Sequence, residues 1–174
     1  LGEPVLPEEE DPVESGTDPT ASGSSRPDHL HARRAIVTGA DSGIGRATAV
    51  ALADAGFDVG ITWHTDENGA HETADEVRRR GVRAVTAQLD TADIPACGDV
   101  VDDIIRRLGG IDVFVNNAGT GTQTPFVDIS LDEWRRVVDT DLTGAFICLQ
   151  SVARSMIEAG RGGRLIAVTS VHAH

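Results

Sequence analysis

Three glycines lie in residues 38–45, TGADSGIG, between a short apolar run and a run with helical periodicity. In a strand–loop–helix context, Gly39 permits a tight turn, Gly43 lets backbone N–H groups approach a pyrophosphate, and Gly45 allows the helix to pack closely on the strand. The N-terminus of the following helix also attracts an anion. The segment therefore predicts a dinucleotide phosphate site, and the alternative is a glycine-rich connector that binds no ligand.

Other polar residues follow further short apolar runs of the chain. His64 follows the run at 58–63, Asp90 follows the run at 82–89, and Asn116–Gly119 lie at the end of the run at 111–117. Ser170 ends the run at 164–170. Because ligands of open α/β sheets bind outside the carboxyl ends of the strands, we expect these residues to lie near the glycine-rich segment.

The elements that must position these residues alternate along the chain in the manner of βαβ units. Strands are predicted at 34–39, 58–63, 82–89, 111–117 and 164–170, and helices at 44–56, 67–80, 98–108 and 130–160. The fold class is therefore α/β, a doubly wound parallel sheet of the Rossmann-like kind.

Two of the helices carry end signals. The helix predicted at 44–56 stops at Gly56, and the helix predicted at 130–160 begins with a capping box of Ser130 and Glu133. The residues expected on the buried side of the first of these helices are Ala47, Val50, Ala51 and Ala55.

The GxxxGxG spacing of residues 39–45, taken with Asn116–Gly119, resembles the classical short-chain dehydrogenase/reductase (SDR) family. The resemblance covers residues 33–174 and implies five of the about seven strands usual in that Rossmann-like fold. It also implies an NAD or NADP cofactor and hydride transfer between the nicotinamide and a carbonyl or secondary alcohol, as in a short-chain alcohol dehydrogenase or carbonyl reductase. The expected cofactor-binding residues are Gly39, Ser42, Gly43, Ile44, Gly45, His64, Asp90, Asn117, Ala118 and Gly119.

The choice between NAD and NADP stays open. A carboxylate at the end of the second strand accepts a hydrogen bond from the ribose 2′-OH of NAD, but this chain has Trp63, His64 and Thr65 there. Ser42 is not basic either, as the corresponding residue often is in NADP-preferring members of the family. Asp90 matches the family's acidic residue beside the adenine, and the alternative for Asp90 is an ordinary turn residue at a strand end.

The resemblance assigns two catalytic positions within the chain. Ser170 matches the serine that hydrogen-bonds the substrate oxygen. Asp141 stands where the family commonly has asparagine, and a carboxylate can accept hydrogen bonds there but cannot donate them. The family's catalytic Tyr and Lys would lie beyond residue 174, and the chain contains neither residue type. We therefore expect the domain to be incomplete at its C-terminus and these 174 residues to be inactive alone.

Composition narrows the partners. The net charge of −13 argues against nucleic acid and anionic membranes, and the only two cysteines, Cys97 and Cys148, are expected to be reduced thiols of a cytoplasmic protein. Residues 1–32, with eight acidic side chains and one arginine, are expected to form a disordered acidic arm before the domain at 33–174. No metal site is expected, although His29, His31, His172 and His174 occur in pairs.

Two alternatives to an enzyme remain open at this stage: a non-catalytic dinucleotide-binding or interaction module, and a truncated fragment without function. The resemblance implies a small carbonyl or alcohol substrate and a parent protein that is a homo-oligomer, either a tetramer or a dimer. The sequence does not identify the substrate.

Overall fold

The structure, a computed structural model, describes residues 33–170. The predicted arm at 1–32 and the paired histidines lie outside the described residues. Five strands and five α-helices alternate, with a 3₁₀ turn η2 (Phe126–Asp128) and a π-helical segment η3 (Asp139–Gly144). The strands are β1 (Arg33–Val37), β2 (Phe57–Trp63), β3 (Ala84–Gln88), β4 (Val113–Asn116) and β5 (Arg164–Ala167). The helices are α1 (Gly43–Asp54), α2 (Glu67–Arg79), α3 (Ile94–Leu108), α4 (Leu131–Val138) and α5 (Ala145–Glu158).

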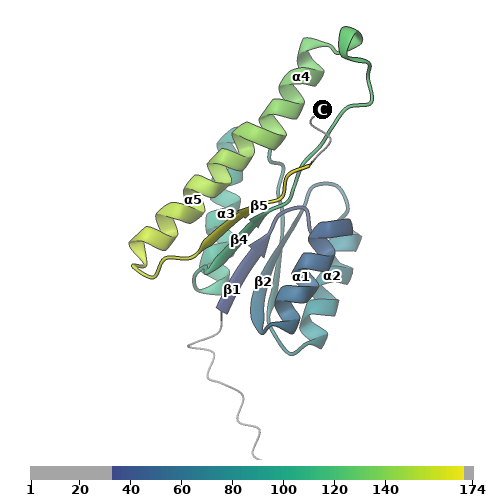
Figure 1. The fold of residues 1–174 in the computed structure, drawn as a ribbon. Coiled ribbons are helices and arrows are strands. Elements are labelled where there is room, and N and C mark those ends of the chain that lie inside the picture. Colours follow the sequence, from purple (N-terminus) through teal and green to yellow (C-terminus); the bar gives the residue numbers. More distant parts are fainter. Residues whose placement is uncertain (1–32, 171–174) are drawn as a thin grey trace, which may run out of the picture.

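All five strands pair in parallel in the order β3-β2-β1-β4-β5, so the predicted doubly wound sheet is confirmed. Figure 1 shows β2, β1, β4 and β5 of this sheet. The order changes direction between β1, which leads to β2 and β3, and β4, which leads to β5. At such a switch point the loops after two neighbouring strands diverge and leave a crevice. The loop after β1 is the glycine-rich segment, and the loop after β4 contains Asn117–Gly119.

Helices cover both faces of the sheet because the side chains of each strand alternate between the faces. Ala35 and Val37 of β1 pack with α1 and α2 on one face, whereas Ile36 packs with α3 and α5 on the other. Cys97 and Cys148 lie free and buried in the second of these clusters. Burial raises the pKa of the Cys148 thiol to about 12, so this thiol is unreactive at neutral pH.

The predicted burial of the first helix is wrong. The buried residues of α1 are Gly45, Ala49 and Ala53, whereas Ala47, Ala51 and Ala55 are exposed and Val50 is only partly buried. Small residues occupy both sides of this helix, so their spacing alone does not mark the side that packs on the sheet. The turn at Gly56 is confirmed: its φ of 82° lies in the left-handed region that glycine adopts without strain.

Two other helix predictions need correction. Helix α3 begins at Ile94 instead of residue 98, because Pro95 fits the first turn of a helix and does not block it. The segment predicted as one helix at 130–160 runs without a break from α4 to α5, but its middle, η3, is π-helical. Within the described part of the chain, no helix is long and apolar enough to cross a membrane.

Candidate functional site

The glycine-rich loop is held between β1 and the end of β2. Gly39 and Gly43 have φ values of 58° and 54°, which other residues rarely adopt. The Gly39 N–H donates to Oγ1 of Thr62 at 3.2 Å, and the Ala40 N–H donates to the Thr62 carbonyl at 2.8 Å. The loop therefore turns sharply above the sheet and delivers the chain to the N-terminus of α1.

The start of α1 is open to a ligand. Ser42 is its N-cap residue, but the Ser42 side chain accepts no capping hydrogen bond from the helix and its hydroxyl lies 3.4 Å from the Asp41 carboxylate instead. No acidic residue lies in the first turn, and the side chain of Ile44 is exposed. Unsatisfied N–H groups at a helix N-terminus bind anions such as phosphate, so these residues fit a pyrophosphate.

Asn117 joins the glycine-rich loop to the end of β4. Its side-chain Nδ2 donates to the carbonyls of Thr38 and Gly39 at 2.9 and 3.0 Å. Gly45 completes this contact, because a Cβ there would lie 2.1 Å from the Gly39 oxygen and 2.6 Å from Nδ2 of Asn117. Any side chain at position 45 would force the helix away from the loop.

Thr38 makes the matching contacts from the other side. Its buried hydroxyl accepts hydrogen bonds from the N–H groups of Asn117 and Ala118, both at 2.9 Å. The sequence predicts no role for this threonine beyond its place in the motif, because its partners lie 79 and 80 residues away along the chain. The two loops at the switch point are therefore fixed to each other by side chains.

A pocket of about 670 Å³ opens at this switch point, and every expected cofactor-binding residue lines it. These residues are Gly39, Ser42, Gly43, Ile44, Gly45, His64, Asp90, Asn117, Ala118 and Gly119. Residues of the lining that the prediction missed include Asp41, Thr65, Thr120, Arg136 and Thr140. Most of the missed residues stand beside a predicted one, so proximity to the strand ends is the signal that could have found them.

His64 and Asp90 meet at one side of this pocket. Nε2 of His64 lies 3.5 Å from Oδ2 of Asp90, and the backbone carbonyl of His64 accepts a hydrogen bond from Gln88 at 2.9 Å. Oδ1 of Asp90 also accepts the Ala92 N–H at 2.9 Å, as a turn residue would. Asp90 thus combines a turn contact with a place in the pocket wall.

The loop after β4 is fastened to α4. Arg136 donates to the Thr120 hydroxyl and to the Gly121 carbonyl at 2.9 and 3.1 Å. The Glu133 carboxylate accepts hydrogen bonds from the hydroxyls of Thr122 and Thr124. These two hydroxyls, with a smaller contribution from the Arg136 charge, hold the pKa of Glu133 below its ordinary value.

The capping box predicted at the start of α4 is only half present. The Ser130 hydroxyl accepts the Glu133 N–H at 3.1 Å, as predicted. The Glu133 side chain, which should reach back to the N-cap residue, binds the loop instead.

The two expected catalytic residues lie outside the lining of this pocket. Oδ1 of Asp141, in η3, accepts the Thr120 N–H at 2.7 Å and so supports the loop after β4. Ser170 is exposed, three residues beyond the end of β5. Among residues 33–170, no three His, Cys, Asp or Glu side chains are grouped so that they could hold a metal ion.

Comparison with known proteins agrees with this fold. A family model described as short chain dehydrogenase matches residues 33–174. The uncharacterized oxidoreductase YohF of Escherichia coli K12 is 52% identical over 143 residues, which make up 82% of this chain and 56% of that protein. The crystal structure of acetoin dehydrogenase YohF from Salmonella typhimurium has a TM-score of 0.79 and 50% identity, over 82% of this chain and 56% of that one.

The chain therefore belongs to the short-chain dehydrogenase family. It spans little more than half the length of the relatives that it matches. One relative of known structure, a short chain dehydrogenase from Burkholderia cenocepacia that is 34% identical, is in complex with NADP, with a TM-score of 0.76 over 80% of this chain and 56% of that one. Carveol dehydrogenase from Mycobacterium avium, 32% identical, is in complex with NAD, with a TM-score of 0.74 over 80% and 55% of the two chains. Relatives of similar distance thus take either dinucleotide.

Proposed function

We propose that the pocket at the switch point binds a nicotinamide dinucleotide, and that the whole protein uses it to interconvert a carbonyl compound and a secondary alcohol. The observation that carries this proposal is the open N-terminus of α1 beneath a glycine-rich loop that is fixed to the end of β4. The first turn of α1 offers backbone N–H groups to the pyrophosphate, and no acidic side chain there competes for them. Membership of the short-chain dehydrogenase family supports the same conclusion.

The chain's own residues would hold and orient the dinucleotide. Trp63, His64 and Asp90 stand on the β2 and β3 side of the pocket, where the adenosine half would lie. Asn117–Gly119 and Thr140 stand on the β4 side, where the nicotinamide half would lie. The bound dinucleotide supplies the hydride acceptor or donor.

The catalytic roles of Ser170 and Asp141 are also part of the proposal. Ser170 would donate a hydrogen bond to the substrate oxygen, whose negative charge changes as hydride moves. Asp141 would act through the loop after β4, because its carboxylate holds the Thr120 N–H. Residues 1–174 contain no Tyr and no Lys, so a proton donor of the family's kind would have to lie outside these residues.

For the substrate we propose small α-hydroxy ketones of the acetoin type and the corresponding diketones. The support is the 50% identity to the acetoin dehydrogenase of Salmonella typhimurium, which is well above the 32% identity to carveol dehydrogenase. The whole protein would be expected to assemble as a homo-oligomer, as the family resemblance implies.

The test separates binding from turnover. Residues 1–174 should bind a dinucleotide in calorimetry yet leave its reduced form unoxidised when diacetyl is added, whereas the whole protein should oxidise it. Gly45→Val should abolish binding, because its side chain would displace the loop. Ala47→Val adds a similar side chain at an exposed position of the same helix, outside the pocket lining, and serves as the control.

Failure of the chain and of the whole protein to bind either dinucleotide would overturn the proposed function. Binding without turnover in the whole protein, with diacetyl and with a panel of simple ketones, would favour the non-catalytic module instead. Turnover of simple ketones but not of diacetyl or acetoin would overturn the substrate class alone.

A further inference from the structure

Asp41 stands beside the end of β2, where the adenosine ribose of a dinucleotide lies in Rossmann-like folds. The peptide before it is tied to β2 through the Ala40 N–H, which donates to the Thr62 carbonyl at 2.8 Å. The backbone oxygen of Asp41 faces the start of α2, since a Cβ on Gly69 would lie 2.7 Å from it. Asp41 lines the pocket together with His64 and Thr65, the residues that follow β2.

This end of the pocket is acidic. Asp41 and Asp90 both line it, whereas Asp66 lies outside the lining at the N-cap of α2, where its carboxylate accepts the Gly69 N–H at 2.9 Å. Nε2 of His64 lies 3.5 Å from the Asp90 carboxylate, so this imidazole already faces a partner within the chain. A phosphate placed here would meet the carboxylates of Asp41 and Asp90.

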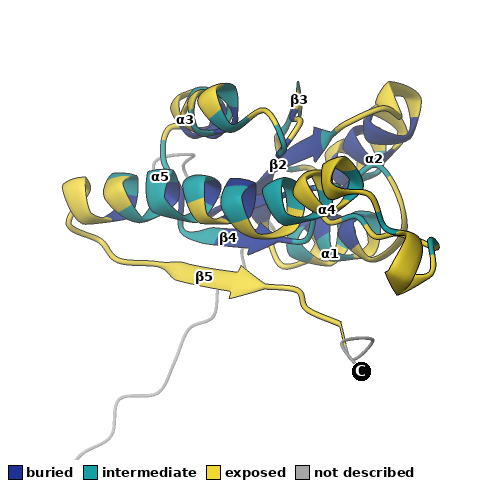
Figure 2. Ribbon diagram, turned by 90° about the horizontal axis from the view of Figure 1, so that it is seen from above, coloured by how far each residue is buried: buried dark blue, intermediate teal, exposed yellow. Residues whose placement is uncertain are grey.

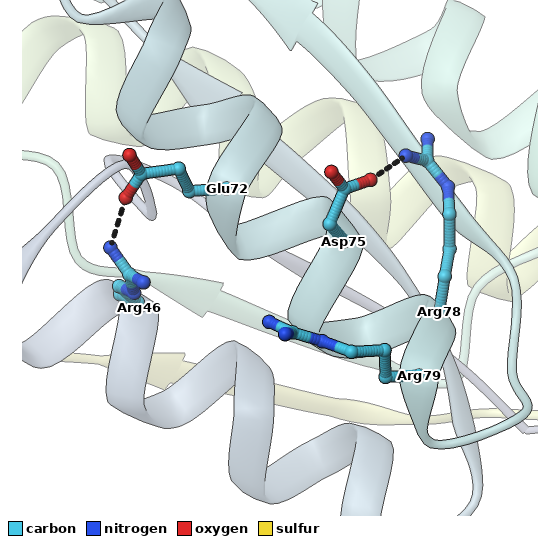
Figure 3. A pocket seen from close by; sticks show the side chains of 5 residues that line it. All are labelled: Arg46, Glu72, Asp75, Arg78 and Arg79. Atoms are coloured by element: carbon cyan, nitrogen blue, oxygen red, sulfur yellow. Dashed lines mark hydrogen bonds and ion pairs between the residues drawn. The ribbon is translucent and has the colours of Figure 1, made fainter.

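Arg46, the arginine nearest in sequence to the glycine-rich loop, does not line the adenosine end of the pocket. Arg46, in the first turns of α1, lies in the groove between α1 and α2, where its guanidinium binds Glu72 at 3.1 Å (Figure 3). The same guanidinium also contacts Glu76. These carboxylates raise the pKa of Arg46, and Arg46 lowers the pKa of Glu76. The Arg46 guanidinium is thus already paired with two carboxylates of α2.

Arg136, which does line the pocket, already donates hydrogen bonds to partners within the chain. Arg136 lines the β4 side and donates to the Thr120 hydroxyl and the Gly121 carbonyl. Of the described residues that line the pocket, Arg136 is the one lysine or arginine. The adenosine side of the lining therefore carries Asp41 and Asp90 without an arginine partner for a 2′-phosphate.

We propose that this pocket takes NAD in preference to NADP, and that the Asp41 carboxylate in the glycine-rich loop is the group that excludes the 2′-phosphate. The inference rests on the proposed function, since it concerns the same pocket. A carboxylate beside the ribose can accept a hydrogen bond from the 2′-OH of NAD, whereas it repels the phosphate that replaces this hydroxyl in NADP. The sequence left this choice open because the discriminating acid stands in the loop after β1 and not at the end of β2.

The experiment compares the dissociation constants of NAD⁺ and NADP⁺ by calorimetry, on the chain as it stands and on two variants. The unchanged chain should bind NAD⁺ at least about tenfold more tightly than NADP⁺, a difference that added salt reduces because it is electrostatic. Asp41→Asn should tighten NADP⁺ binding by about threefold or more while changing NAD⁺ binding less. Asp75→Asn removes the same charge from α2, where Asp75 pairs with Arg78 outside the pocket, and should leave the ratio unchanged (Figure 3).

A second pair of ligands, which lack the nicotinamide half, tests the effect of the 2′-phosphate alone. Adenosine 5′-monophosphate should bind more tightly than adenosine 2′,5′-bisphosphate, and Asp41→Asn should narrow that gap. Equal or tighter binding of NADP⁺, or a ratio that Asp41→Asn does not move, would overturn this inference and leave the proposed function intact. Absence of binding by every dinucleotide would overturn both.

Discussion

Thr38 is the residue on which the geometry of the pocket depends most directly. One buried hydroxyl accepts two backbone N–H groups, from Asn117 and Ala118, and so fixes the end of β4 against the loop that leaves β1. Without that oxygen, both N–H groups would be partly buried with no partner nearby, which costs more than the loss of a hydrogen bond at the surface.

We therefore predict that Thr38→Val, which keeps the shape and removes the hydroxyl, lowers the free energy of unfolding by about 2 kcal/mol. Dinucleotide affinity should fall as well, because the two walls of the pocket are no longer fixed to each other. Urea unfolding measures the first effect and calorimetry the second. Thr38→Ser keeps the hydroxyl and should retain most of both quantities, so a serine variant as damaged as the valine variant would contradict this role.

At the scale of the elements, Glu133 shows how α4 holds the loop that leads to it from β4. Its carboxylate accepts hydroxyl hydrogen bonds from Thr122 and Thr124, and these contacts lower its pKa from the ordinary value of 4.5. A group whose pKa is lower in the folded chain stabilises the fold above its ordinary pKa and loses that contribution as the pH falls through the lowered value.

The prediction is that Glu133→Gln makes thermal stability less dependent on pH between about pH 6 and pH 3. The variant should melt at a lower temperature than the unchanged chain at the upper pH, and the two should converge at the lower pH as the carboxyl of the unchanged chain becomes protonated. Glu158→Gln, at an exposed position at the end of α5, is the matched control and should follow the unchanged chain. Parallel curves for the chain and Glu133→Gln would show that the carboxylate has no such role.

The elements differ in how well the sequence predicts them, and the reason is the range of the interactions. All five strands are predictable because each contains a short apolar or β-branched run that stops at glycine or polar residues, as Ala35–Val37 does. The π-helical η3 is not, because its residues have the same period as their helical neighbours. Glu133 was predicted to cap α4, but its hydroxyl partners come from a loop whose position depends on the tertiary fold.

The residues of the pocket also divide into those that local sequence patterns predict and those whose positions depend on the tertiary fold. Its glycines and strand-end residues are predictable since the parallel sheet itself brings the ends of β1, β2, β3 and β4 together. Arg136 and Thr140 could not be predicted as lining residues, because α4 and η3 reach the pocket only through the course of the loop after β4. Local sequence patterns thus predict the glycines and strand-end residues of the pocket, whereas the remaining lining residues are placed by tertiary packing.

At the scale of the whole molecule, β5 is the part of the sheet with least cover. It is the last strand in the order β3-β2-β1-β4-β5, and all four of its residues are exposed (Figure 2). Leu165 and Ile166 are 45% and 46% exposed, although strands of parallel sheets are normally buried on both faces. An exposed apolar strand at the end of a sheet pairs readily with other chains.

We therefore predict that residues 1–174 alone self-associate, and that Ile166→Lys reduces this association, because a charged side chain on a terminal strand opposes pairing with a second sheet. Light scattering coupled to size-exclusion chromatography over a range of concentrations measures the effect. Val127→Lys makes the same exchange at an apolar residue of η2 that is 85% exposed and distant in sequence from β5, and it should leave the association unchanged. If the unchanged chain is a monodisperse monomer with a sharp, cooperative melting transition, β5 does not cause self-association. If Ile166→Lys and Val127→Lys reduce the association equally, its cause is general surface hydrophobicity and not this strand.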